Sequence, residues 1–285
     1  MKFIKKVLIT LPIFFLLFFF LMLAYIIAIS IGGIISPDVS GPVYLLVKRF
    51  YPLLAAMILL LWAKKKSPGI YKRIHSALSL TTVNGKKFII FLGISLAILY
   101  TSFLVSMLLG YSKFKHFGNT IYSSHSIIEY YLLVWLLGNL CVAIGEEIIF
   151  RGFLINYITV ISRSWIISLL IVSLVFSTHY YPDLLNNLIA FIAGLATGYA
   201  YLKFESLYPS IGIHLAFNIF NATIASEASH GPQLPYLMKF DYPMITSGFG
   251  AYVDLFIIIG MAMILVILYL SEKRIFKKNF FKIKV

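Results

Sequence analysis

Residues 7–35 read VLITLPIFFLLFFFLMLAYIIAISIGGII, a stretch without a single charged residue. At 1.5 Å per residue, a helix of this length exceeds the ~30 Å of hydrocarbon in a bilayer. Lys2, Lys5 and Lys6 precede it, as in a signal peptide. The run is, however, far longer than the ~7–15 apolar residues of a cleavable signal. The stretch therefore predicts a retained transmembrane helix.

The whole chain shares this apolar character. Of its 285 residues, 61% are hydrophobic and 12% are charged, against ~45–50% and ~25% in soluble domains. A soluble core of this size cannot hide so much apolar surface, so the composition excludes a soluble enzyme and a disordered chain. Cys141 is the single cysteine, which excludes an intrachain disulfide. We expect an all-α, polytopic membrane protein that forms one membrane domain over residues 1–285.

Further apolar runs predict a bundle of about eight transmembrane helices. The run near Val43–Ala63 is the weakest, because Lys48 and Arg49 interrupt it. We expect connecting loops over Ser67–Lys87 and over Ser226–Gly250, and for the second segment we prefer a plain loop to a substrate-access lid. The predicted spans are Val7–Ile35, Val43–Ala63, Phe88–Gly110, Ile127–Phe150, Trp165–Tyr180, Leu184–Leu202, Leu207–Ile224 and Ala251–Leu270.

The positive charges predict the orientation of the bundle. The formal net charge is +14, and lysine and arginine collect in the cytoplasmic connections of membrane proteins. With eight spans, one side of the membrane receives only Lys113, Lys115 and Lys239. Both termini are therefore expected in the cytoplasm, where the basic C-terminal tail would touch anionic lipid of the bilayer. Because the charge records orientation, we expect no nucleic-acid partner. The basic side carries Lys2, Lys5, Lys6, Lys64–Lys66, Lys72, Arg73, Lys86, Lys87, Arg163, Lys203, Lys273, Arg274, Lys277, Lys278, Lys282 and Lys284.

A few polar residues interrupt the apolar runs, and the functional prediction rests on them. An Asp, Lys or Arg inside a bilayer costs about 2.5–3.5 kcal/mol on insertion scales. Such residues therefore indicate pairing or function. The group consists of Glu146, Glu147, Arg151, His179, His214 and Asn218.

Glu147 and Arg151 lie four residues apart in the segment CVAIGEEIIFRG, residues 141–152. On a helix they share one face, where we expect an ion pair with a structural role. Glu146 is rotated by about 100° from that face and has no partner within its own helix. A carboxyl group in this setting suits proton transfer.

His179 lies near the end of the apolar run LVFSTHYYP, residues 174–182. A lone histidine on a helix is usually structural, but a hairpin would bring this one to Glu146. If the chain turns near Ser162 and Arg163, both residues lie about 16 positions from the turn, or ~24 Å along their helices. This pairing requires a fourth helix that extends past Arg151, because Pro182 ends the helix of His179.

His214 and Asn218 are also four residues apart and share a face of the seventh predicted span. Two interpretations are equally open: hydrogen bonds that join helices, or donors that stabilise an oxyanion. The preceding GxxxG pattern, Gly194–Gly198, predicts close helix packing.

One glutamate, two histidines and one asparagine suit the hydrolysis of an amide bond. A glutamate with an imidazole can deprotonate water, while a second imidazole and an amide hold the developing negative charge. The sequence contains neither the zinc-binding pattern HExxH nor the nucleophile pattern GxSxG. Nothing near Cys141 marks it as an activated nucleophile.

The order of these motifs resembles the CPBP intramembrane proteases, also called the CAAX protease or Abi family, which include the eukaryotic Ras-converting endopeptidase. The resemblance rests on Glu146-Glu147-x-x-x-Arg151, on His179, on the GxxxG span and on His214-x-x-x-Asn218, and it covers a core of about residues 127–225. There is one departure. The second motif of the family is usually Phe-x-x-x-His, whereas position 175 is Val and the phenylalanine is Phe176, to which we assign a packing role.

The resemblance implies an eight-helix membrane endopeptidase with a cavity that opens to the cytoplasm. It implies that Glu146 and His179 activate a water and that His214 and Asn218 stabilise the oxyanion. Glu147 and Arg151 would order the helix. The family is described both as metal-dependent and as metal-free, and one Glu with two His could ligate a zinc ion with an open position. We prefer the metal-free scheme and expect no cofactor apart from such a divalent metal.

We therefore expect an intramembrane endopeptidase that acts on a membrane-associated peptide or protein. Lysine outnumbers arginine and Ile, Phe and Asn are abundant, which is typical of AT-rich bacterial genomes. This bias favours a bacterial cell-membrane protein in bacteriocin self-immunity or peptide maturation over prenyl-protein processing. One alternative is a non-catalytic membrane protein that sequesters a toxin or partner. Another is a transporter with a Glu/His proton relay, but the sequence lacks the broken helices in two related halves that this would favour.

Overall fold

The structure is a computed structural model that describes residues 2–35, 42–79, 81–117, 131–178, 184–225, 238–241 and 251–270. Short strands accompany its helices: β1 (Lys113–Phe117), β2 (Ile224–Ala225) and β3 (Met238–Asp241). The α-helices and the two π-helices, η1 and η2, are α1 (Lys2–Ile35), α2 (Pro42–Arg49), α3 (Tyr51–Lys66), α4 (Pro68–Ala77), α5 (Thr82–Leu108), η1 (Tyr131–Gly138), α7 (Asn139–Glu147), η2 (Ile148–Ile155), α8 (Asn156–Ser162), α9 (Trp165–Thr178), α10 (Leu184–Phe204), α11 (Leu207–Thr223) and α12 (Ala251–Leu270).

These helices have the lengths and composition of a membrane bundle. Among the described residues, four helices are long and apolar enough to cross a bilayer: Val43–Lys66, Thr82–Leu108, Leu133–Ser162 and Leu184–Phe204. The helix α9 and the parts Phe19–Ile35 of α1 and Asp254–Leu270 of α12 are shorter apolar stretches. The chain is thus an all-α, polytopic integral membrane protein, as its composition predicts. The number of eight spans stays a prediction.

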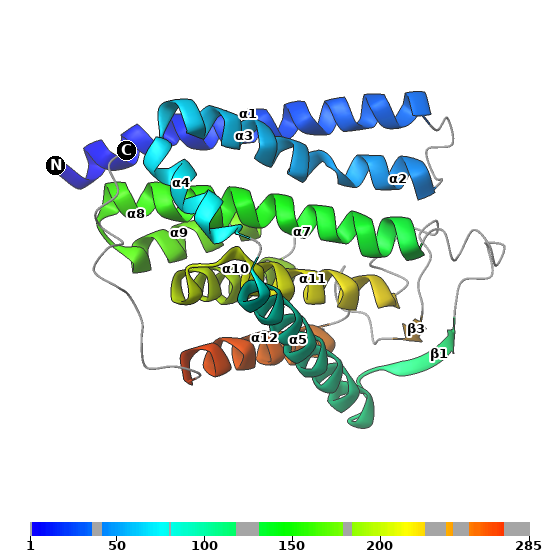
Figure 1. Cartoon of the computed structure of the whole chain (residues 1–285). Coiled ribbons are helices and arrows are strands. Elements are labelled where there is room, and N and C mark those ends of the chain that lie inside the picture. Colours follow the sequence, from blue (N-terminus) through cyan, green and yellow to red (C-terminus); the bar gives the residue numbers. More distant parts are fainter. Residues whose placement is uncertain are drawn as a thin grey trace.

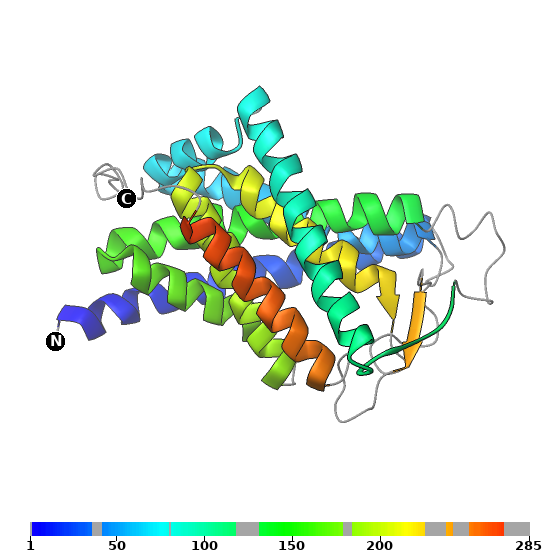
Figure 2. The same cartoon turned by 90° about the horizontal axis from the view of Figure 1, so that it is seen from below.

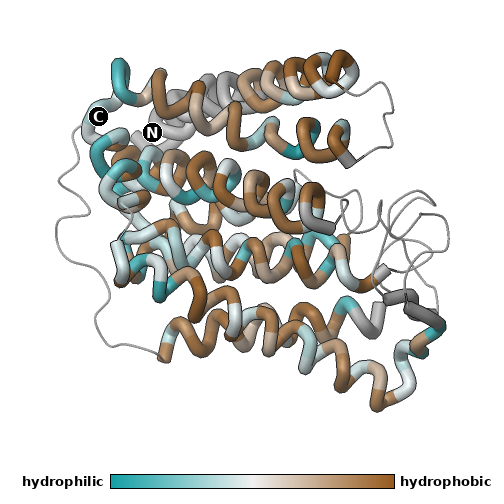
Figure 3. Tube along the Cα trace, turned by 45° about the vertical axis from the view of Figure 1, so that its right-hand side comes forward, coloured by the Kyte–Doolittle hydropathy of each residue, from teal (hydrophilic) through white to brown (hydrophobic). Residues whose placement is uncertain are grey.

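The two ends of the bundle differ in what they carry. α1 begins and α12 ends at the same end, which also carries α4, whereas β1 and β3 lie at the opposite end (Figure 1, Figure 2). This arrangement is the one that an even number of spans requires. Hydrophobic residues dominate the long helices, and hydrophilic residues gather towards the helix ends (Figure 3). The side of the membrane that each end faces stays a prediction.

Two segments predicted as loops contain regular structure. Ser67–Lys87 holds α4 and the start of α5, because a proline suits the first turn of α4 and Ile70, Ile74 and Ala77 recur on its buried face. The described part of Ser226–Gly250 is β3, which pairs antiparallel with β1 and parallel with β2. These strands are short and far apart in the sequence, so no local pattern predicts their pairing.

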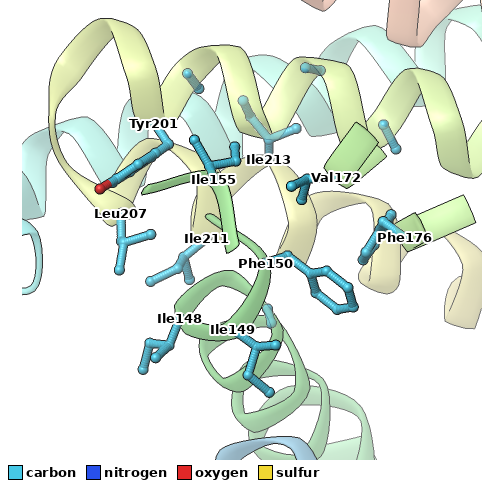
Figure 4. Packing of buried hydrophobic residues seen from close by; sticks show 14 of the residues in the cluster. Ile148, Ile149, Phe150, Ile155, Val172, Phe176, Tyr201, Leu207, Ile211 and Ile213 are labelled. Atoms are coloured by element: carbon cyan, nitrogen blue, oxygen red, sulfur yellow. The ribbon is translucent and has the colours of Figure 1, made fainter. Parts of the chain in front are cut away.

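The core of the bundle is centred on η2. Figure 4 shows side chains of η2 packed among those of α9, α10 and α11. Buried residues of this cluster include Ile148, Ile149, Phe150, Ile155, Val172, Phe176, Tyr201, Leu207, Ile211 and Ile213. The segment that carries the predicted motif therefore lies in the middle of the fold.

Several glycines allow close approaches between helices. A Cβ atom at Gly198 would lie 2.5 Å from Cδ1 of Leu169, and one at Gly194 would lie 3.0 Å from Cα of Ser173. The predicted close packing at the GxxxG pattern is thus confirmed, and its partner is α9. A Cβ atom at Gly145 would lie 2.4 Å from backbone atoms of Pro52 and Leu53. α3 therefore passes directly against the turn that holds Glu146 and Glu147.

Replacing Gly145 by alanine is expected to lower the melting temperature of the purified protein in detergent. The new methyl group would meet the backbone of α3, which cannot move aside as the end of a flexible side chain can, and overpacking of this kind costs about 1–3 kcal/mol. Gly93→Ala is the matched control, since a Cβ atom there has nothing within 4 Å. Equal melting temperatures for the two variants would contradict the close crossing.

Candidate active site

Three of the six predicted functional side chains, those of Glu146, Glu147 and Arg151, lie on one long helix that changes its geometry next to them. From Tyr131 to Ser162 the helix continues through η1, α7, η2 and α8. Its hydrogen-bonding pattern changes from α to π at Ile148, directly after Glu147. Such π segments are rare in proteins, and those that occur are often found at functional sites. All residues of η2 are buried, so the change lies inside the bundle.

Glu147 joins its own helix to α11. Its Oε1 atom lies 2.9 Å from Nη1 of Arg151, and both side chains are buried. The predicted ion pair therefore forms. The same oxygen lies 2.8 Å from Nδ1 of His214. Because a carboxylate only accepts hydrogen bonds, Nδ1 of His214 is the donor in this contact.

The other ring nitrogen of His214 faces Glu146. Nε2 lies 3.6 Å from Oε2 of Glu146, and both side chains are buried. The two neighbouring glutamates thus contact the two nitrogens of one imidazole. Since Glu147 fixes the ring through Nδ1, Nε2 is the atom that can exchange a proton at the Glu146 side of the site.

Phe176 contributes more to the site than the packing role predicted for it. The guanidinium carbon of Arg151 lies 4.4 Å from the centre of the Phe176 ring, a cation–π contact. The ring also meets His214 edge-on at 5.8 Å and Phe150 edge-on at 5.2 Å, measured between ring centres. Phe176 therefore packs against both Arg151 and His214. A phenylalanine three positions before the motif histidine is the sequence signal for it.

The predicted turn between the fourth and fifth spans is confirmed. α8 ends at Ser162, Arg163 takes a left-handed conformation with φ 60°, and α9 begins at Trp165. The antiparallel pair of α8–η2 and α9 brings Phe176 to Arg151. His179 directly follows the last described residue of α9 and lies outside the described residues. Its pairing with Glu146 stays a prediction.

A cavity of about 80 Å³ lies beside His214. Asn218 also lines it, so the predicted shared face of His214 and Asn218 is confirmed. Most of the wall is apolar, with polar groups concentrated on α11. The lining residues are Val142, Phe176, Ala190, Ala193, Thr197, Ile213, His214, Phe217, Asn218, Asn221 and Met261.

The described residues do not supply enough metal-binding atoms for a zinc site. Glu147 is engaged by Arg151, and Nδ1 of His214 is engaged by Glu147. Glu146 and Nε2 of His214 are two donors where zinc takes at least three from the protein. No cluster of three or more His, Cys, Asp or Glu is found in the part of the chain that the structure describes, and His179 lies outside it. A zinc ion held with the help of His179 stays a prediction.

A buried asparagine fixes the C-terminal end of the motif helix, and sequence reasoning missed it. Nδ2 of Asn156 donates to the Gly152 carbonyl at 2.6 Å and contacts the Tyr201 hydroxyl at 2.5 Å. These bonds join the end of η2 to α10. An asparagine within an apolar run, just over one turn after Arg151, is the signal that would have indicated it.

Comparison with known families agrees with this geometry. Residues 128–220 match the family described as type II CAAX prenyl endopeptidase Rce1-like. The match coincides with the predicted core of about residues 127–225 and includes Glu146, Glu147, Arg151, Phe176, His214 and Asn218, whereas Asn221 and Met261 of the cavity lie beyond it. No curated protein and no solved structure shows a significant match. Residues 128–220 of this membrane protein are therefore similar to the CPBP/CAAX family.

Proposed function

We propose that this protein is an intramembrane endopeptidase that hydrolyses a peptide bond in a membrane-associated peptide or protein. The observation that carries the proposal is the placement of one imidazole between two buried glutamates. Nδ1 of His214 is held by Glu147, and Nε2 faces Glu146 at 3.6 Å. The match of residues 128–220 to a family of CAAX proteases supports peptide-bond hydrolysis as the reaction.

In the proposed reaction Glu146, aided by His179, takes a proton from a water molecule. The water oxygen attacks the carbonyl carbon of the substrate, which gives a tetrahedral oxyanion. Asn218 donates from its amide, and His214 donates from Nε2 when both ring nitrogens carry protons. The C–N bond then breaks, and Glu146 returns the proton to the leaving nitrogen.

The Glu147–Arg151 pair has a supporting role in this scheme. Glu147 accepts from Nδ1 and so fixes the plane of the His214 ring. Its negative charge also balances the positive charge of a doubly protonated imidazole. Arg151 and Phe176 in turn hold Glu147 and the ring in place. A site with such fixed side chains needs little rearrangement during the reaction.

The biological substrate we propose is a bacterial membrane peptide, in bacteriocin self-immunity or in peptide maturation. Processing of a prenylated protein is the competing assignment, because the description of the matching family includes a prenyl endopeptidase. The non-enzymatic alternative is a membrane protein that binds and sequesters a toxin. The buried site of paired Glu and His residues favours chemistry over sequestration, since such groups are costly in a membrane.

The test compares the membrane peptides of cells that produce the wild type with those of cells that produce a Glu146→Ala/His179→Ala double variant. We expect uncut precursors to accumulate only with the double variant, as seen by mass spectrometry of the membrane fraction. The assay is repeated with a chelator and with added zinc to test the metal. Glu205→Ala, at a half-exposed acidic residue paired with Arg73, is the matched control.

Two results would contradict the proposal. Identical peptide patterns for wild type and double variant would exclude a protease that uses these residues. Full protection against a bacteriocin by a well-inserted double variant would favour sequestration.

A further inference from the structure

The cavity beside His214 has a polar stripe that extends beyond the family-like motif. His214, Asn218 and Asn221 lie at positions i, i+4 and i+7 of α11 and all line the cavity. These spacings put the three side chains on one face of the helix. His214 and Asn218 belong to the proposed catalytic machinery, whereas no role has been assigned to Asn221.

Asn221 carries a polar atom that faces no protein partner in the described part of the chain. Its Oδ1 is buried and has no hydrogen-bond partner among the described residues. Burial of an amide oxygen without a partner is unfavourable, and most such groups in folded proteins are paired. In Asn156, Nδ2 bonds both Gly152 and Tyr201, although its Oδ1 is also without a partner among the described residues. An unpaired amide on a cavity wall indicates a partner that binds in the cavity.

The chemistry of the cavity defines that partner. An asparagine amide has one acceptor and two donors, which match the N–H and C=O groups of a peptide unit. Phe217, Ala193 and Met261 give the same cavity an apolar wall. A lipid acyl chain would suit this wall, but it would leave the amides of Asn218 and Asn221 unpaired. An extended peptide with apolar side chains can pack those side chains against the apolar wall and form hydrogen bonds with the amides through its backbone.

We propose that Asn221 binds the backbone of an extended, apolar peptide substrate about three residues from the bond that is cleaved. Seven residues of helix place Asn221 ~10.5 Å from His214 along the axis of α11. An extended chain advances ~3.4 Å per residue, so three residues cover this distance. The assignment rests on the proposed function, because it takes the bond at His214 as the point of cleavage.

The first test measures peptide binding separately from cleavage. The full chain with Glu146→Gln is placed in nanodiscs, and a fluorescent positional library of apolar twelve-residue peptides serves as the probe. We expect Asn221→Leu in this background to weaken binding about tenfold. Asn187→Leu is the matched control, because Oδ1 of Asn187 is likewise buried with no partner in the described part of the chain, but Asn187 does not line the cavity. It is expected to bind as the parent protein does.

A second measurement locates the hydrogen bond. In the peptide that binds best, single backbone amides are replaced one by one by esters, which lack the N–H donor. The peptide with the ester three residues from the cleaved bond should bind the parent protein more weakly than the all-amide peptide does. The Asn221→Leu protein should bind both peptides with equal affinity. In the otherwise wild-type protein, Asn221→Leu should raise KM about tenfold and leave kcat within about twofold.

Protein stability separates a binding role from a structural one. Because Oδ1 of Asn221 has no hydrogen-bond partner among the residues that the structure describes, Asn221→Leu should leave the melting temperature equal or higher. Asn156→Leu should lower it by several degrees, since it loses two hydrogen bonds. An equal decrease in both variants would show a structural role for Asn221 and overturn the inference.

The remaining outcomes distinguish the inference from the proposed function. Cleavage with an unchanged KM and unchanged binding in Asn221→Leu would overturn the inference and leave the protease. Peptide binding that depends on Asn221, with no cleavage by the wild type, would support the inference and contradict the protease. Binding of a prenylated lipid probe that depends on Asn221, with no peptide binding, would overturn the inference in favour of a lipid site.

Discussion

Purified Glu146→Gln protein is expected to insert and fold like the wild type and to cleave its peptide substrate about 10²–10⁴-fold more slowly. Glutamine keeps the size of the side chain and its contacts with neighbouring atoms, but it cannot take a proton from water. The rate is measured as a single turnover in nanodiscs, with the peptide that accumulates in cells lacking activity. A single turnover separates the chemical step from binding and product release.

The control for this substitution removes a carboxylate elsewhere. Glu205→Gln changes a glutamate whose side chain is 48% exposed and which lies 3.7 Å from Arg73. It should cleave at the wild-type rate. If Glu146→Gln cleaves as fast as Glu205→Gln, the carboxylate that faces Nε2 of His214 is not the base, and the proposed reaction is wrong.

Contacts within one helix could be predicted from the sequence. The spacing of four residues predicts the Glu147–Arg151 pair, and the structure confirms it at 2.9 Å. The same spacing predicts that His214 and Asn218 share a face, and both line one cavity. Helical periodicity determines these relations, so no knowledge of the neighbouring helices is needed.

Contacts between helices could not be predicted in the same way. The bond from His214 to Glu147 joins residues that are 67 positions apart, and one sequence does not say which helices are neighbours. A hairpin predicts that His179 pairs with Glu146, and His179 lies outside the described residues. Among the described residues, the imidazole that faces Glu146 comes from α11, which the hairpin does not predict. The contacts of Phe176 with Arg151 and His214, and of Asn156 with Tyr201, were not predicted for the same reason, since these partners lie on other helices.

The local backbone geometry at two places also could not be predicted from the sequence. The change from α to π hydrogen bonding at Ile148 has no sequence pattern, although it lies directly after Glu147. α4 was expected to be a loop, because it has only ten residues and begins with Pro-Gly. In both cases tertiary packing, with Ile74 of α4 close to Gly152 of η2, stabilises what the local sequence does not favour.

Loss of the Arg151 charge alone is expected to destabilise the protein strongly. Arg151→Leu leaves the buried carboxylate of Glu147 without its cation, and breaking a buried pair in this way costs about 3–5 kcal/mol. It also removes the cation–π contact with Phe176. The measurement is the free energy of unfolding in detergent, or the melting temperature. Glu205→Gln, at an exposed pair, should change it by about 0–1 kcal/mol.

Removal of both charges separates stability from function. The double variant Glu147→Gln/Arg151→Leu holds no unpaired buried charge at this pair, so most of the lost stability should return. The introduced glutamine amide can still accept a hydrogen bond from Nδ1 of His214, but it cannot balance a doubly protonated ring. We therefore expect a protein that is nearly as stable as the wild type and cleaves slowly. Recovery of both stability and rate would show that the pair only supports the fold. No recovery of stability would show that Arg151 acts mainly through Phe176 and Phe150, whose ring centres lie 4.4 Å and 5.8 Å from its guanidinium carbon.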